Sequence, residues 1–100
     1  MENQHRKITG YRELSQQEVD LMNRIKAKGA ELLDLQAELR KNIEAAFDQK
    51  HLASTPGDSP ETRELQRFIA AEPYRWADIG KTDIQTGIMA LVRAVAQPAV

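Results

Sequence analysis

The sequence predicts an all-α fold, in which long antiparallel helices form a hairpin behind a short N-terminal arm. Three observations support this prediction. After Ser15, apolar residues recur at alternating steps of three and four over roughly thirty positions, which marks one face of a helix. A dense run of turn-forming residues at 53–60 separates this stretch from a second helical pattern. No segment has the pattern of a strand.

Length and composition restrict the number of domains and the size of the core. A chain of 100 residues predicts one domain, 1–100, which buries only about two-thirds of its unfolded surface. Aromatic residues make up 5% of the chain and charged residues 29%, which suits long helices whose apolar stripes are completed by other subunits. The absence of cysteine excludes disulfides and thiolate chemistry.

Charge and hydropathy indicate which partners to expect. The net charge of −1 argues against a general binder of DNA or RNA, which would be strongly basic. It leaves room for a small anion in a local basic pocket. Apolar runs are short and no leader pattern opens the chain, so we expect a cytoplasmic protein that contacts no membrane.

The N-terminal arm, residues 1–14, concentrates chemistry that suits a nucleotide. Residues 5–12 contain one tyrosine, one glycine and several cationic or titratable side chains. A flat ring beside cations can recognise a base and its phosphate. The alternative is a disordered basic tail, which residue types alone favour.

The long helix is expected at 15–50. Ser15 and Glu18 fit a capping box, and Leu14 and Val19 occupy the positions of a hydrophobic staple. Gly29 lies on the apolar stripe. Glycine inside a helix makes helix formation less favourable by about 1 kcal/mol relative to alanine. Gly29 is either a tolerated weak spot or a point of close approach by another helix or a ligand.

Turn residues at 51–59 predict a loop, followed by a short helix at 60–72. Ser59 is the expected cap, with Pro60 in the first helical position and Glu61 favourably placed in the first turn. Pro73 should break or kink this helix. A last helix is then expected over 74–96.

The last helix has two different faces. Trp76 and Leu91 belong to the apolar face, which we expect to pack in the core. Arg75, Thr82 and Thr86 follow at steps of seven and four on the polar face, so a guanidinium and two hydroxyls could receive phosphate oxygens. The alternative is an ordinary solvated face, which the pattern alone favours.

No constellation for catalysis is apparent. His5 and His51 have no cysteines or spaced carboxylates beside them to complete a metal site. Asp78 and Asp83, five positions apart, are expected on different sides of one helix. There is no glycine-rich phosphate loop. We therefore expect no enzyme, no catalytic residue, no metal and no cofactor.

Several motifs resemble one known family. The stretch His5-Arg6-Lys7-Ile8-Thr9-Gly10-Tyr11-Arg12-Glu13-Leu14, with Leu21-Met22-Asn23-Arg24-Ile25-Lys26, resembles the N-terminal half of a phage family of anti-CBASS cyclic-nucleotide sponges. Segments 75–79, 82–87 and 89–95 resemble its C-terminal half. The hairpin is also similar to that of the related anti-Thoeris sponges. The match covers about two-thirds of the chain, and residues 34–72 are not distinctive.

The resemblance implies a function. Members are compact homo-hexamers that bind cyclic oligonucleotide messengers, such as cGAMP and cyclic trinucleotides, in the cytoplasm of the infected bacterium and do not cleave them. For cyclic dinucleotides, it implies that Tyr11 stacks on a base and Lys26 lies near a phosphate. The surrounding residues are expected to form the pocket wall, namely Arg6, Gly10 and Arg12.

The resemblance also implies a separate pocket for cyclic trinucleotides, to which we assign Arg75, Thr82 and Thr86. The competing hypothesis is a structural helical-hairpin adaptor whose whole function is oligomerisation. It predicts the same hairpin but gives no reason for Tyr11 and Lys26.

Overall fold

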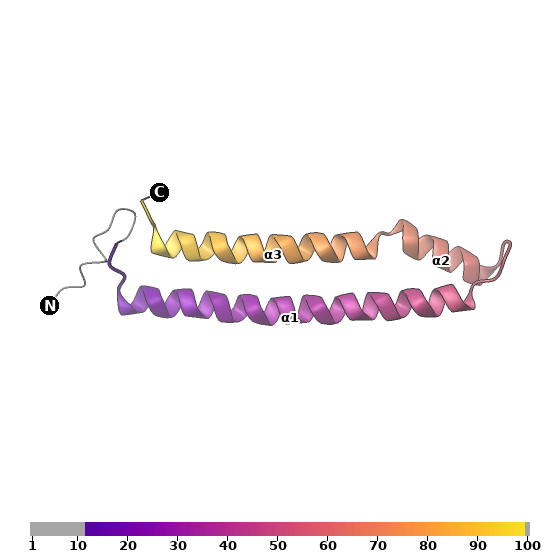
Figure 1. Cartoon of the computed structure of the whole chain (residues 1–100), viewed down its shortest axis with the longest axis horizontal. Helices are drawn as coiled ribbons and strands as arrows, with labels where there is room; N and C mark the ends of the chain where they lie inside the picture. Colours follow the sequence, from indigo (N-terminus) through magenta and orange to yellow (C-terminus); the bar gives the residue numbers. More distant parts are fainter. Residues whose placement is uncertain (1–11, 100) are drawn as a thin grey trace.

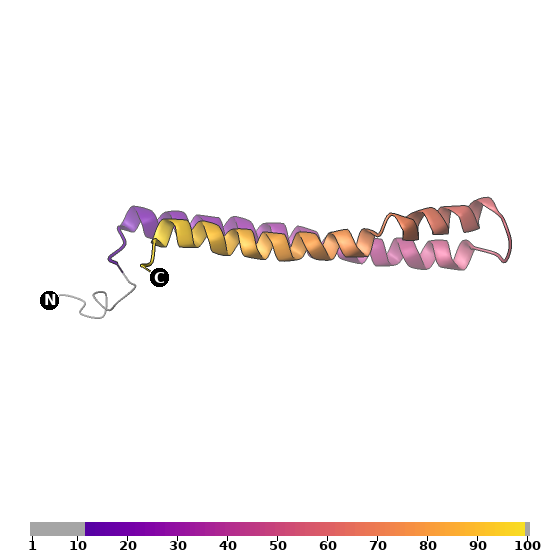
Figure 2. The same cartoon turned by 90° about the horizontal axis from the view of Figure 1, so that it is seen from above.

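The computed structural model describes residues 12–99 and consists of three helices. Helix α1 spans Gln16–Ala53, α2 spans Pro60–Ala70 and α3 spans Pro73–Ala96. Helix α1 lies antiparallel to α2 and α3, so α1 begins and α3 ends at the same end of the molecule (Figures 1 and 2). The chain measures 76 × 22 × 16 Å. The predicted all-helical hairpin is confirmed.

The start of α1 is fixed by a complete capping box. The Ser15 hydroxyl accepts a hydrogen bond from the Glu18 N–H at 3.1 Å, and the Glu18 carboxylate accepts one from the Ser15 N–H at 2.9 Å. This predicted motif is confirmed. The helix ends at Ala53 instead of the expected 50. The Ser54 N–H still bonds the carbonyls of Lys50 and His51, and the helix stops there because Ser54 adopts an extended conformation with ψ of 146°.

The short helix and the last helix meet at a sharp junction. The Ser59 hydroxyl caps α2 by accepting the Thr62 N–H at 3.1 Å, with Pro60 in the first turn, as predicted. Helix α2 stops at Ala70, not at 72, because Glu72 adopts a left-handed conformation with φ of 53°. Pro73, not residue 74, opens α3, since a first helical position needs no N–H donor.

Close contact between α1 and α3 is made at Gly29. A Cβ atom placed on this buried glycine would lie 2.2 Å from Cδ1 and 2.5 Å from Cγ1 of Ile88. Any side chain there would overlap Ile88. Of the two meanings that the sequence left open for Gly29, the structure supports close approach by another helix.

Polar and aromatic contacts connect α1 to the beginning of α3. The Gln36 amide donates to the carbonyl of Ala77 at 3.0 Å, and the Arg40 guanidinium pairs with Asp78 at 3.1 Å. The same guanidinium lies over the Tyr74 ring, 4.4 Å from its centroid. These contacts fix the register of the hairpin.

Helix α2 is held against the last turns of α1. The Phe47 and Phe68 rings lie 6.4 Å apart, and Lys50 pairs with Glu64 at 3.1 Å. The Glu64 carboxylate also accepts a hydrogen bond from Arg67 at 2.6 Å. The Arg67 hydrogen bond, then the Lys50 one, lower the pKa of Glu64 to about 2.

The apolar faces are only partly covered within one chain. Among the described residues, Ile43 and Ala77 are the only buried hydrophobic side chains. Trp76 and Leu91 were expected in the core but are 58% and 56% exposed, because a two-helix hairpin covers only one side of each helix. Other large apolar side chains are also exposed, namely Leu21, Leu32, Leu35, Leu39, Leu52, Ile69 and Met89.

Candidate functional site

The predicted dinucleotide site is described only in part. Tyr11, Gly10 and Arg6 lie outside the described residues. Arg12 and Lys26 lie within them, Arg12 just before α1 and Lys26 on the helix itself. Lys26 follows the first residue of α1 by ten positions, which corresponds to about 15 Å of helical rise.

Arg12 is surrounded by hydrogen-bond acceptors. Its Nη2 donates to the Glu18 carboxylate and to the Val95 carbonyl, both at 2.7 Å, and its Nε donates to the Ala96 carbonyl at 2.9 Å. A longer bond of 3.4 Å joins Nη1 to Glu18. The Arg12 hydrogen bond, followed by that of the Ser15 N–H, lowers the pKa of Glu18 to about 2.

Lys26 is an exposed cation on α1 and forms no ion pair with another residue of the 12–99 segment. It does not line the apolar groove described below, although its neighbours Ile25 and Ala27 do. Its ammonium group is therefore available to an anion, as a phosphate partner must be.

Arg75 and Thr82 line a common hollow on α3, with a volume of about 520 Å³. Thr86, predicted to share their site, does not line this hollow. Arg75 contacts its own helix, because its guanidinium lies 5.0 Å from the Trp76 ring centroid and pairs with Glu72 at 3.7 Å. The Thr82 hydroxyl donates back to the Asp78 carbonyl at 3.3 Å.

Two carboxylates line the same hollow. Asp78 and Asp83 were expected on different sides of α3, yet both border it. The hollow spans enough of the helix surface to reach both residues. Asp78 pairs with Arg40 at 3.1 Å, which offsets part of its charge. Within one chain, the hollow is thus not a cationic phosphate cradle.

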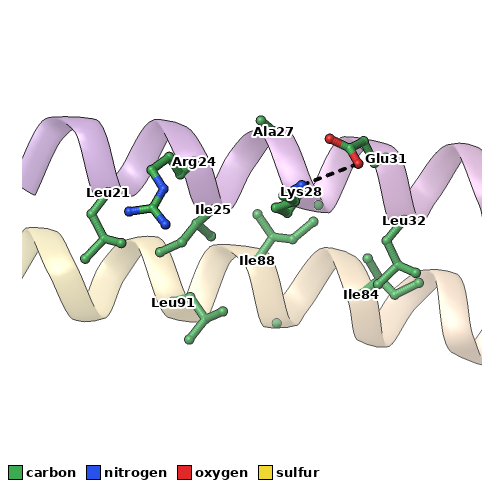
Figure 3. A pocket seen from close by; sticks show the side chains of 12 residues that line it. Leu21, Arg24, Ile25, Ala27, Lys28, Glu31, Leu32, Ile84, Ile88 and Leu91 are labelled. Atoms are coloured by element: carbon green, nitrogen blue, oxygen red, sulfur yellow. Dashed lines mark ion pairs between the residues drawn. The ribbon is translucent and has the colours of Figure 1, made fainter.

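An apolar groove runs between α1 and α3. It has two adjoining parts of about 650 and 760 Å³, which share Leu32 and Ile84. Figure 3 shows Leu32, Ile84 and Ile88 between the two helices of the first part, with charged side chains on α1 beside them. The remaining apolar lining includes Leu21, Ile25, Leu91, Leu35, Leu39 and Trp76.

The described part of the chain has neither a metal-binding cluster nor a helix that could span a membrane. No cluster of three or more histidine, aspartate or glutamate side chains there is arranged to hold a metal ion. No helix among residues 12–99 is both long and apolar enough to cross a membrane.

Comparison with known proteins identifies the family. Residues 3–96 match the family described as the Acb2/Tad1 hairpin domain. The chain belongs to the Acb2/Tad1 hairpin family. It is also 61% identical to Anti-CBASS protein 2 of Pseudomonas phage JBD67 over 105 aligned residues, which cover 98% of this chain and 97% of that protein. The family expected from the N- and C-terminal motifs is confirmed.

Sequence reasoning missed one feature of this end of the molecule. Arg12 was expected as a pocket wall, and no local pattern indicated that it bonds the carbonyls of Val95 and Ala96 more than eighty positions away. The apolar groove, in contrast, agrees with the expectation that other subunits complete the apolar stripes of the long helices.

Proposed function

We propose that this hairpin protein binds and sequesters cyclic di- and trinucleotide messengers of the bacterial CBASS defence, without cleaving them, in the cytoplasm of an infected host. The observation that carries the proposal is the 61% identity to Anti-CBASS protein 2 of a Pseudomonas phage along almost the whole of both chains. Binding without cleavage would keep the messenger from its effectors.

The dinucleotide site is proposed to combine Tyr11 and Lys26. A two-fold subunit contact would offer two rings and two ammonium groups to a ligand with two bases and two phosphates. Each stacked base is worth roughly 1–3 kcal/mol and each charge-assisted hydrogen bond about 1.5–3 kcal/mol. Two of each supply about 5–12 kcal/mol, which is less than the −12.3 kcal/mol of nanomolar binding plus the costs of association, so tight binding requires further contacts from the pocket walls.

The trinucleotide site is proposed at Arg75, Thr82 and Thr86 on α3. Asp78 and Asp83 beside them would repel phosphates, so this site needs further cations or N–H donors. A neighbouring subunit is the natural source, since one hairpin presents this surface without a second wall. We therefore place this pocket between subunits.

Assembly into a hexamer is part of the proposal. Leu32 and Ile84 lie where the two parts of the apolar groove meet, and within residues 12–99 Leu32 stays exposed and Ile84 is only half-buried. Packing of other subunits into this groove would bury apolar surface at about 25 cal/mol per Å². The same packing would bring the arms and the outer faces of α3 together at shared pockets.

Calorimetry with one cyclic dinucleotide and one cyclic trinucleotide tests the two sites. Tyr11→Ala and Lys26→Ala should abolish or severely weaken dinucleotide binding, whereas Arg75→Ala should spare it and weaken trinucleotide binding. Lys41→Ala is the matched control, because Lys41 is another exposed lysine of α1, about 22 Å further along by helical rise. It should bind both ligands normally.

Three outcomes would contradict this proposal. Equal loss of both ligands in Tyr11→Ala and Arg75→Ala would indicate one shared pocket. Normal binding in every variant would remove these residues from the site. A wild-type protein that shows no thermal shift with any cyclic oligonucleotide would favour a structural adaptor, since saturation at 100 times the Kd should add about 2.7 kcal/mol.

A further inference from the structure

Arg12 joins three parts of the chain at one end of the hairpin. Its guanidinium bonds the Glu18 carboxylate in the first turn of α1 and the Val95 and Ala96 carbonyls in the last turn of α3. These bonds and the longer one from Nη1 use four of the five N–H groups of the side chain. Arg12 is therefore engaged in a structural contact before any ligand arrives.

Both partners favour a cation at this position. The last carbonyls of a helix lack partners within the helix and carry its partial negative charge, so an arginine is stabilised there. Helix α3 ends beside this contact, where Gln97 adopts a left-handed conformation with φ of 50° and donates its N–H to the Arg93 carbonyl at 2.8 Å. Glu18 is held in turn by the Ser15 N–H.

Arg12 is the neighbour of Tyr11 in the sequence, so the contact that holds Arg12 also affects Tyr11. Arg12 follows Tyr11 directly, and consecutive Cα atoms are about 3.8 Å apart across a trans peptide bond. A side chain that is anchored to both α1 and α3 thus holds Arg12, the residue to which Tyr11 is covalently joined, in place. The anchoring groups lie on rigid helices and not on the arm itself.

We infer that Arg12 is a positioning residue that latches the base of the N-terminal arm to α1 and α3, and so orients Tyr11 for stacking. The inference rests on the proposed dinucleotide function. It assigns Arg12 a role different from that of a wall that touches the ligand. If loss of the latch leaves the competent arrangement about one-tenth populated, the apparent affinity falls tenfold.

Calorimetry with a cyclic dinucleotide separates the latch from direct phosphate contact. Arg12→Ala should weaken binding about tenfold. Glu18→Gln keeps a capping-box residue but removes the charge that Arg12 faces, and it should also weaken binding. The double variant should bind no more weakly than Arg12→Ala alone, because both changes release the same contact. Undiminished binding by Glu18→Gln would instead indicate that Arg12 contacts the ligand, and would overturn the latch.

Two controls exclude a general effect on the fold. Arg63→Ala removes a similar arginine–carboxylate pair, with Asp58 at 2.6 Å, at the opposite end of the hairpin, and should bind the dinucleotide normally. Trinucleotide binding should be unchanged in the Arg12 and Glu18 variants. Equal loss in Arg63→Ala, or equal loss of trinucleotide binding, would reduce Arg12 to a stabilising residue and refute positioning.

A measurement without ligand tests the latch independently of the proposed function. The heteronuclear ¹H–¹⁵N NOE of the Arg12 and Glu13 amides should have helix-like values in the wild type and fall in Arg12→Lys, which keeps the charge but lacks the planar fork. Unchanged values in Arg12→Lys would refute the latch. Wild-type protein with high values but no dinucleotide binding would support the contact and overturn the proposed function.

Discussion

Gly29 determines how closely α1 and α3 approach each other. It lies in the first half of α1, where Ile88 of α3 occupies the space that a side chain would need. A Cβ atom placed on either of the other helical glycines, Gly80 and Gly87, would meet no neighbouring side chain within 4 Å. Only Gly29 is therefore required by the contact between the two helices of one chain.

Gly29→Ala is expected to destabilise the hairpin. Alanine gains up to about 1 kcal/mol in helix propensity, but overpacking against Ile88 costs roughly 1–3 kcal/mol. We expect a net loss of about 1 kcal/mol in the free energy of unfolding, measured by urea denaturation. Gly29→Ala combined with Ile88→Val should lose less than the sum of the single losses. Strict additivity would contradict the contact.

Helix ends were predicted from capping residues. These predictions were accurate where the capping hydrogen bond is local in the sequence. Ser15 and Ser59 cap their helices through side chains that bond an N–H only three residues away, so sequence alone identified both. The junction near Glu72 was misplaced by two residues. Its left-handed backbone depends on how α2 and α3 both pack on α1, which residue types do not reveal.

Two helix-associated carboxylates should make stability depend on acid pH. The pKa of Glu18 and that of Glu64 are each lowered from 4.5 to about 2. A depressed pKa in the folded state contributes stability that is present above 4.5 and is lost as the pH falls towards 2. The midpoint of thermal unfolding should therefore fall over this range.

Removing the charges of Glu18 and Glu64 tests whether these two carboxylates cause the pH dependence. Glu18→Gln with Glu64→Gln should flatten the slope of the unfolding midpoint between pH 4.5 and 2. Glu44→Gln is the control, because Glu44 is exposed on α1 and forms no ion pair with another described residue. A double variant that keeps the wild-type slope would show that other groups control the acid response.

The whole molecule is a thin hairpin with little core of its own. Its radius of gyration is 22.0 Å, whereas a compact chain of this length has about 13 Å. The apolar period along the sequence predicted the hairpin, because it depends on local spacing. The proposed pockets would be shared between subunits, so their shape would depend on subunit packing, which neither the sequence pattern nor one chain determines.

Blocking the apolar groove should prevent assembly. Leu32 borders both parts of the groove and is 48% exposed, so Leu32→Lys places a charge in the proposed interface with little effect on the hairpin itself. Sedimentation should show a hexamer for the wild type at micromolar concentration and smaller species for the variant. Met89→Lys is the control, because Met89 is 70% exposed and does not line the groove. A well-folded wild-type monomer would contradict the assembly.

Recovery of bound messenger distinguishes sequestration from cleavage in a single experiment. The protein is incubated with a cyclic dinucleotide, separated from free ligand by filtration and then denatured, and the released nucleotide is identified by chromatography and mass spectrometry. We expect the ligand to be retained by the wild type, lost from Tyr11→Ala, and released as the intact cyclic molecule. Linear dinucleotide or mononucleotides would reveal an enzyme, and wild-type protein that retains no ligand would contradict sequestration.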